Sequence, residues 1–141
     1  MTLYAESSAV LAWLLGEPAG SQVRELLASA DLVIASDLTL IECERVLIRA
    51  VALGEIAEAE AAGRQAHLHA TAAHWNLLRI GGEIVDRARQ RFPGEPVRTL
   101  DAIHLASALV ARSAIVALEI LSLDDRIRAV ARRLGMQLQP A

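Results

Sequence analysis

The sequence contains no lysine and only one cysteine, and these two features limit the kinds of functional site that the protein can form. All 14 basic residues are arginines. Arginine suits two-pronged contacts with phosphate, although a genome-wide compositional bias would give the same pattern. Cys43 alone excludes an intrachain disulfide and a multi-cysteine zinc site, so we interpret it as a buried apolar thiol. Two tryptophans, one tyrosine and one phenylalanine are too few for a base-stacking platform.

Long hydrophobic runs are also absent. The longest, Ala9 to Leu15, is far short of the roughly 20 residues needed to cross a bilayer. No basic segment precedes an apolar stretch at the N-terminus, so we expect no signal peptide. We therefore expect a cytoplasmic protein with no membrane partner. Hydrophobic residues nevertheless make up 54% of the chain, which favours a self-association or partner surface. The same run is interpreted as a helix buried at a sheet or in an interface.

Length and charge set further limits. At 141 residues the chain is expected to form one domain, residues 1–141, with a substantial core. The net charge of −3 argues against a protein that coats nucleic acid.

Short apolar strands alternate with amphipathic helices along the chain. The expected strands are Leu3-Tyr4, Leu32–Ala35, Trp75–Ile80, Glu119–Leu123 and Met136–Leu138. The expected helices are Ala9–Leu15, Val23–Ala28, Leu40–Leu53, Ile56–Ala73, Glu83–Phe92, a helix opening near Thr99, and Asp125–Leu134. This alternation predicts a three-layer α/β fold with a mainly parallel sheet.

The stretch Arg98–Leu109 has apolar residues at three- and four-residue steps, which predicts a helix with one buried face. Thr99 is the expected N-cap. Asp101 would lie in the first turn, where free backbone N–H groups and the helix dipole favour an anion. Taken alone, this pattern is typical of a well-started helix with no catalytic role.

Acidic residues recur at similar junctions. Glu6, Glu42 and Asp124 follow strands, and Asp101 can reach the same edge, where strand-to-helix turns of a parallel sheet open and ligands bind. Local alternatives exist, such as a Thr39–Glu42 capping box. Carboxylates gathered at one edge would repel one another unless a divalent cation bound there. Oxygen ligands favour Mg²⁺ or Mn²⁺ over zinc. The residues thus indicate a metal-dependent phosphodiesterase or phosphatase, without choosing between them.

Four segments resemble, in order and spacing, the acidic motifs of PIN-domain ribonucleases, above all the toxins of VapBC-type toxin–antitoxin modules. They are Tyr4–Ala9, Thr39–Glu42, Leu100–Ala106 and Leu121–Arg126, and the resemblance spans essentially the whole chain.

The resemblance implies an α/β/α domain that cleaves RNA as a Mg²⁺- or Mn²⁺-dependent endoribonuclease. It also implies a homodimer and a cognate antitoxin that blocks the acidic site. Carried over by position, Glu6, Glu42, Asp101 and Asp124 would be the catalytic, metal-holding residues, with Ser7 or Ser8 orienting Glu6 and Ser122 orienting the fourth acid.

One departure concerns the first motif, where the family usually presents Asp and this chain has Glu6. The extra methylene moves the carboxylate by roughly 1–1.5 Å. This keeps open a catalytically impaired domain that binds RNA or protein without cutting. A metal-dependent phosphatase is a separate rival, which the acidic residues alone leave open. Asp125 rivals Asp124 for the fourth position, but we interpret Asp125 as the helix N-cap.

Other polar residues lie near the motifs. His104, one turn beyond Asp101, could touch substrate, but we interpret it as a partly buried histidine packing beside the site. His67 and His69 point to different faces of their helix and are expected on the surface. Four arginines could either hold phosphate or pair with neighbouring acids: Arg45, Arg49, Arg98 and Arg126.

Overall fold

A five-stranded, all-parallel sheet forms the centre of the protein, in a computed structural model that describes residues 1–141. The strand order is β3-β2-β1-β4-β5. The strands are β1 (Thr2–Ala5), β2 (Leu32–Ser36), β3 (Asn76–Leu78), β4 (Leu118–Leu121) and β5 (Gln137–Gln139). The expected strands and their parallel arrangement are therefore confirmed, with boundaries shifted by one to a few residues.

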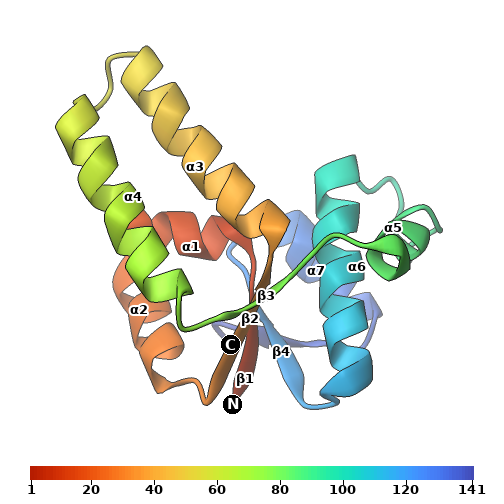
Figure 1. Cartoon of the computed structure of the whole chain (residues 1–141). Helices are drawn as coiled ribbons and strands as arrows, with labels where there is room; N and C mark the ends of the chain where they lie inside the picture. Colours follow the sequence, from red (N-terminus) through yellow and green to blue (C-terminus); the bar gives the residue numbers. More distant parts are fainter.

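Helices cover both faces of the sheet. They are α1 (Ser7–Leu14), α2 (Gly20–Ser29), α3 (Asp37–Ala52), α4 (Glu58–Ala72), α5 (Gly82–Ala88), α6 (Thr99–Ala114) and α7 (Asp125–Arg133). Figure 1 shows α1 to α4 on one side of the sheet and α5 to α7 on the other. This arrangement confirms the predicted three-layer fold.

The central strand shows why both layers are needed. Successive side chains of a strand point to opposite faces. Tyr4 packs with the α5–α7 side of the core, whereas Leu3 and Ala5 pack with the α1–α4 side. All three side chains are fully buried, as expected for a strand inside a parallel sheet that helices cover on both faces.

The first helix needs no partner protein to explain its apolar character. In α1, the side chains of Ala9, Val10, Ala12 and Leu14 are buried, and the helix packs against both α2 and α3. Core packing therefore accounts for the longest hydrophobic run.

Several expected helix boundaries were wrong, including the starts of α2 and α3, which begin at Gly20 and Asp37 rather than at Val23 and Leu40. The helix predicted over Glu83–Phe92 ends at Ala88, and Phe92 instead enters the core from a loop, with Arg87 stacked 4.2 Å from its ring centre. The N-cap of α6 is Arg98 rather than Thr99. Arg98 is extended, and its carbonyl accepts the first helical hydrogen bond, from Ala102 at 2.8 Å. The helix thus begins one residue earlier than the side-chain preference of Thr99 suggested.

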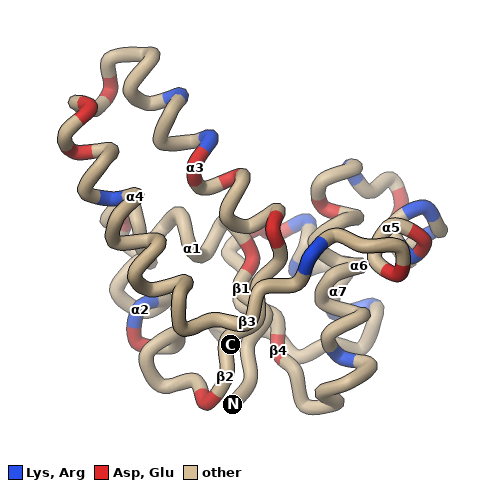
Figure 2. The backbone as a smooth tube through the Cα atoms, in the orientation of Figure 1, with Lys and Arg blue, Asp and Glu red and all other residues tan.

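The parallel arrangement places the carboxyl ends of all the strands along one edge. Figure 2 shows acidic positions gathering there, near the end of β1 and the first turns of α3. From the same edge, α3 and α4 project beyond the body of the molecule as a helical hairpin (Figure 1). None of the helices combines the length and apolar character that a membrane span requires.

Candidate active site at the carboxyl edge of the sheet

Glu6 follows the last residue of β1 and caps the helix that comes next. Its Oε1 accepts a hydrogen bond of 3.1 Å from the Ser8 backbone N–H, which makes Glu6 the N-cap of α1. Its Oε2 accepts hydrogen bonds from two hydroxyls, Ser8 Oγ and, at 2.7 Å, Ser122 Oγ. The side chain is only 6% exposed. The longer side chain is thus folded back onto its own helix, where three donors fix its carboxylate.

The two serines also connect Glu6 to the fourth motif. The Leu123 backbone N–H donates to Ser8 Oγ at 2.9 Å, and the Asp124 backbone N–H donates to Ser122 Oγ at 3.1 Å. Ser8 and Ser122 therefore join the start of α1 to the loop after β4. Ser122, which we expected to orient the fourth acid, donates its own proton to Glu6.

Asp124 caps the last helix. Its Oδ1 accepts hydrogen bonds from the backbone N–H groups of Arg126 and Ile127, at 2.8 and 3.2 Å. The interpretation of Asp125 as N-cap was wrong, because Asp125 is already the first helical residue. The other oxygen of Asp124, Oδ2, accepts neither of these hydrogen bonds. Asp124 can therefore cap the helix and still offer an oxygen to the site.

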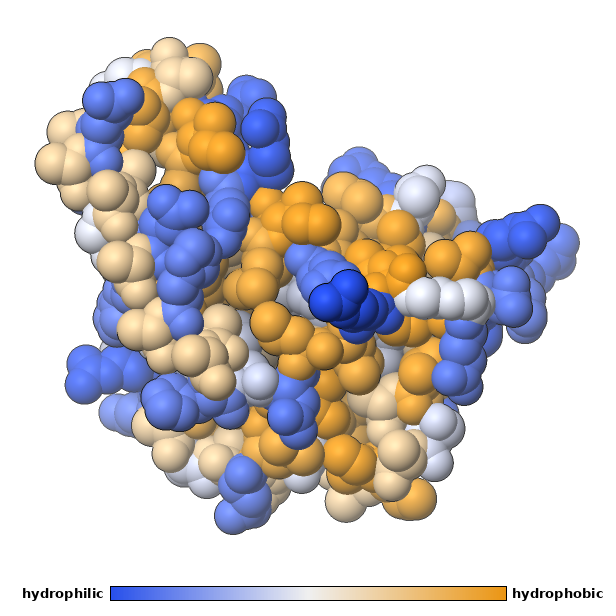
Figure 3. All heavy atoms as spheres, viewed as in Figure 1, coloured by the Kyte–Doolittle hydropathy of each residue, from blue (hydrophilic) through white to orange (hydrophobic).

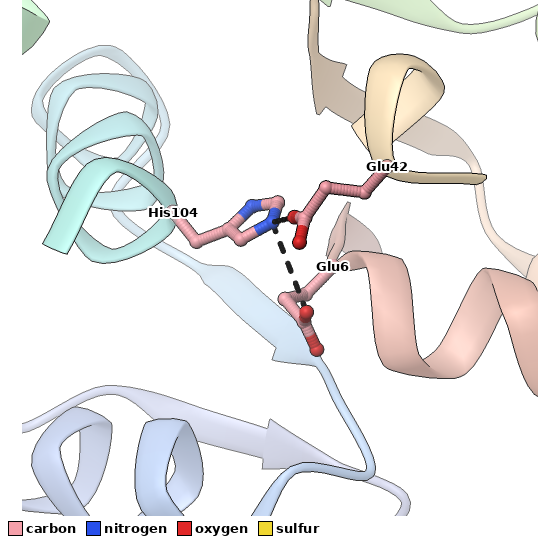
Figure 4. Close-up of side chains that lie close together, drawn as sticks. All are labelled: Glu6, Glu42 and His104. Atoms are coloured by element: carbon pink, nitrogen blue, oxygen red, sulfur yellow. Dashed lines mark hydrogen bonds and ion pairs between the residues drawn. The ribbon is translucent and has the colours of Figure 1, made fainter. Parts of the chain in front are cut away.

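Glu42 and His104 meet across the site from different helices (Figure 4). The Nε2 atom of His104 lies 2.5 Å from Glu42 Oε1 and 3.8 Å from Glu6 Oε1. Ser7 Oγ donates to the same Glu42 oxygen at 2.8 Å, so Ser7 serves Glu42 rather than Glu6. Burial alone would raise the pKa of Glu42, but the hydrogen bonds from His104 and Ser7 and the charge of His104 outweigh it and lower the pKa.

His104 is held from behind by a buried hydroxyl. Its Nδ1 lies 3.0 Å from the hydroxyl of Tyr4, which donates to Ser36 Oγ at 3.1 Å. Burial, reinforced by the charge of Glu6, raises the pKa of Tyr4 to about 12, so the hydroxyl stays protonated. With both ring nitrogens engaged, the imidazole has a fixed orientation. The side chain is 2% exposed, so His104 is fully rather than partly buried beside the acids.

Asp101 lies in the first turn of α6. Burial raises its pKa, and the negative charges of Asp124 and Glu6 raise it further, against smaller opposing effects of His104 and Arg126. These interactions show that Asp101 lies close enough to Asp124 and Glu6 for their negative charges to act on its carboxylate. The four expected acids therefore converge on one edge of the sheet.

The donor set fits a divalent cation. Glu6, Glu42 and His104 place atoms of ligand type within 4.8 Å of one another, but both ring nitrogens of His104 are engaged in hydrogen bonds, so the carboxylates are the free ligands. Asp101 and Asp124 stand outside this tight group, but Asp101 interacts electrostatically with both Asp124 and Glu6. Oxygen-rich sets of this kind suit Mg²⁺ or Mn²⁺, and a cation would relieve the repulsion that raises the pKa of Asp101.

The capping-box alternative for Glu42 was wrong. Thr39 lies inside α3, and its hydroxyl donates at 2.9 Å to the carbonyl of Ala5, at the end of β1. This hydrogen bond joins the start of α3 to the central strand. Glu42 lies in the second turn of α3 and contacts the site residues Ser7 and His104 instead of capping the helix.

Residues expected outside the site are outside it. Cys43 is buried, and burial together with nearby glutamates raises its pKa to about 12, which makes its thiol unreactive. His67 and His69 are exposed, and His69 pairs with Glu44 rather than with a site residue.

A model of the PIN domain family matches residues 3–133 of this chain. The chain belongs to the PIN-domain family. Among curated proteins, this PIN domain is 36% identical over 134 residues to Ribonuclease VapC46 of Mycobacterium tuberculosis (strain ATCC 25618 / H37Rv), covering 95% of this chain and 93% of that protein. It is thus a homologue of a VapC ribonuclease, and the predicted resemblance is confirmed.

Solved structures share the PIN-domain fold. A crystal structure of M. tuberculosis VapC20, described as a toxin that cleaves the sarcin-ricin loop, has a TM-score of 0.67 at 17% identity, covering 90% of this chain and 93% of that one. VapBC2 of Rickettsia felis, bound to a promoter DNA fragment, has a TM-score of 0.67 at 11% identity, covering 99% and 98%. At these identities the likeness shows the fold alone.

Proposed function

We propose that this PIN domain is a metal-dependent endoribonuclease and the toxin of a type II toxin–antitoxin system. The observation that carries the proposal is the convergence of Glu6, Glu42, Asp101 and Asp124 on the carboxyl edge of the sheet. Homology to a VapC ribonuclease supports the choice of RNA over a phosphomonoester.

In this proposal Glu6, Glu42, Asp101 and Asp124 hold Mg²⁺ or Mn²⁺. When bound, such a cation lowers the pKa of water and neutralises charge on the phosphate and the leaving oxygen. The chain's own residues set the geometry. Ser8 and Ser122 fix the carboxylate of Glu6, and Ser7 and His104 fix that of Glu42.

The site is open enough for a chain-like substrate. The Glu42 side chain is 28% exposed, and Asp101 and Asp124 are partly exposed at the rim, so a phosphodiester can approach from solvent. Glu6, by contrast, is buried. A site that combines partly exposed acids with one fixed and buried acid suits the binding of an internal phosphate of a long polymer.

We assign two protein partners to the same molecule, a second copy and a cognate antitoxin. Exposed apolar side chains on or just beyond α3 support this assignment: Ile41 is 52%, Ile48 54% and Leu53 58% exposed. Burying such side chains in a protein interface would be energetically favourable. Figure 3 shows hydrophobic residues on the projecting α3–α4 hairpin beside charged ones. With RNA as substrate, we place the action of the protein in the cytoplasm.

The test is cleavage of a pool of structured RNAs by the purified protein, freed of any antitoxin, with Mg²⁺, Mn²⁺ or EDTA. We expect cleavage that requires metal and is lost in Asp101→Asn. A chromogenic phosphomonoester serves as the second substrate. Its hydrolysis without RNA cleavage would establish the phosphatase instead.

A second candidate, an impaired PIN domain that binds without cutting, rests on Glu6 in place of the usual Asp. The variant Glu6→Asp separates the two. Because Ser8 and Ser122 hold the carboxylate at its present length, the shorter side chain should lose these contacts and cleave RNA more slowly. A large gain of cleavage would favour the impaired domain.

A further inference from the structure

A pocket of about 570 Å³ lies beside the acidic site. It is bordered by the loop that precedes α6, the first turns of α6, and α7. Its lining residues are Gly94, Pro96, Val97, Arg98, Asp101, Leu105, Arg126, Ala129, Val130 and Arg133. We call this the arginine pocket. Its volume lies in the range of small-molecule sites in proteins.

Three arginines, Arg98, Arg126 and Arg133, line the pocket, and none of their guanidinium groups forms an ion pair with an acid, although the charge of Arg126 acts on Asp101. Arg64, by contrast, pairs with Glu60 on α4. Of the two alternatives that the sequence left open for Arg98 and Arg126, ion pairing with neighbouring acids is not seen. Unpaired arginines around a concave surface are suited to the two-pronged binding of phosphate.

Hydrogen bonds within the loop hold the rim of the pocket in a defined conformation. The carboxylate of Glu95 accepts backbone hydrogen bonds from Phe92 at 2.8 Å and from Val97 at 2.7 Å, which closes the loop on itself. At its tip, Gly94 has a φ of +87°, a conformation that L side chains rarely adopt. A Cβ there would lie 3.4 Å from the guanidinium of Arg133, so the bare glycine lets the loop pack along that side chain.

The interior of the pocket is apolar. Leu105 is fully buried and Val130 is 7% exposed, and both line the pocket together with Val97. A pocket with an apolar interior and a cationic rim matches the two halves of a nucleotide, a flat base or ribose and a charged phosphate.

The pocket is continuous with the acidic site through Asp101, which lines it. The same carboxylate interacts electrostatically with Asp124 and Glu6. A polymer whose phosphate lay at the acids would therefore extend its neighbouring nucleotide towards the arginines.

We propose that the arginine pocket binds the nucleotide adjacent to the scissile phosphate, with its phosphate on Arg126 and Arg133 and its base or ribose on the apolar interior. This inference rests on the proposed ribonuclease function and names the part of the substrate that the pocket takes. It also explains how a chain of net charge −3 with a cluster of acids attracts a polyanion.

The test is binding of a fluorescein-labelled, ten-nucleotide single-stranded RNA, measured by fluorescence polarisation in EDTA so that no cleavage occurs. The variants are Arg126→Gln and Arg133→Gln. The matched control is Arg132→Gln, which removes the same charge from the same helix at a residue outside the pocket lining.

Each pocket variant should weaken binding about five- to tenfold, as expected for one partly exposed charge-assisted contact. Each should also lower the slope of log affinity against log salt by about one. Arg132→Gln should stay within about twofold of wild type. Equal losses in all three variants, or no loss in any, would overturn the proposal.

Cleavage assays keep this inference separate from the proposed function. Metal-dependent cleavage with pocket variants that keep wild-type KM would reject the pocket and leave the ribonuclease standing. Arginine-dependent RNA binding by a protein that cleaves nothing would reject the ribonuclease and leave the pocket as a nucleotide site.

Discussion

Asp101 carries a carboxylate whose ionised form the folded protein disfavours. Burial and the charges of Asp124 and Glu6 raise its pKa above the ordinary 3.8. A raised carboxyl pKa means that the folded state binds the proton more tightly than the unfolded state, so ionisation costs stability at neutral pH, and this cost disappears as pH falls below the ordinary value.

We therefore predict that Asp101→Asn stabilises the metal-free protein at pH 7.5 while abolishing RNA cleavage. The gain should be under about 1 kcal/mol because the carboxylate is partly exposed to water, and it should shrink as the pH falls towards 3.8. Urea unfolding of both proteins across this pH range measures it. A loss of stability at pH 7.5, or a gain that does not change with pH, would contradict this account of the acidic field.

His104 acts through its neighbour rather than on the substrate, because its ring is 2% exposed and bonded at both nitrogens. We predict that His104→Leu weakens Mn²⁺ binding about tenfold or more, since Glu42 loses a charge-assisted hydrogen bond that orients it. His104→Gln should lose less, because its amide can still donate to Glu42.

Calorimetric Mn²⁺ titrations of the two variants test this role, with urea unfolding as the check on folding. The pKa of Glu42, now lowered, should also rise in the leucine variant, so that its carboxylate protonates at a higher pH. Equal Mn²⁺ affinities in both variants at equal stability would show that His104 only packs beside the site and does not orient Glu42.

The acids could be predicted from the sequence because each sits at a fixed distance from a strand end or a helix start. The hydrogen bond between His104 and Glu42 could not be predicted, because it joins side chains 62 positions apart and depends on the relative orientation of α6 and α3. The only available signal was the place of His104 one turn after Asp101. The catalytic roles of the four acids stay predictions.

At the scale of elements, one glycine sets how closely two helices approach. A Cβ on Gly20, the first residue of α2, would overlap the backbone carbonyl of Ala12 in α1. We predict that Gly20→Ala destabilises the protein by at least about 2 kcal/mol, because backbone atoms cannot move aside as a side chain can.

Gly63 provides the matched control. It lies inside α4, and a Cβ there would meet nothing within 4 Å. Gly63→Ala should stabilise the protein by about 0.5–1 kcal/mol, the ordinary helix preference for alanine. Urea unfolding measures both. Two changes of the same sign would show that the contact between α1 and α2 does not control the substitution.

Element types were more predictable than element ends. The alternation of apolar strands and amphipathic helices follows from burial, which the sequence displays directly. Helix ends depend on competition among neighbouring backbone groups, so Arg98 rather than Thr99 caps α6, and Asp124 rather than Asp125 caps α7. The last case matters for the site, because the same carboxylate faces the other acids.

At the scale of the whole molecule, the fold gathers residues from four distant motifs at one edge of the sheet. Glu6 lies between β1 and α1, Glu42 in α3, Asp101 in α6 and Asp124 in the loop after β4. No segment contains the site alone, and the parallel sheet is what brings these residues together. Beside them, the arginine pocket offers charge of the opposite sign to the same substrate.

The central claim is that these four carboxylates form one divalent-cation site, and Mn²⁺ titration calorimetry tests it most directly. Wild type would be compared with Glu6→Gln, Glu42→Gln, Asp101→Asn and Asp124→Asn. The controls are Glu44→Gln and Asp125→Asn, each close in sequence to a site acid but placed elsewhere. We predict that each site variant lowers Mn²⁺ affinity about tenfold or more while both controls bind as wild type. Affinity that survives all four site substitutions, or falls equally in the controls, would contradict the account.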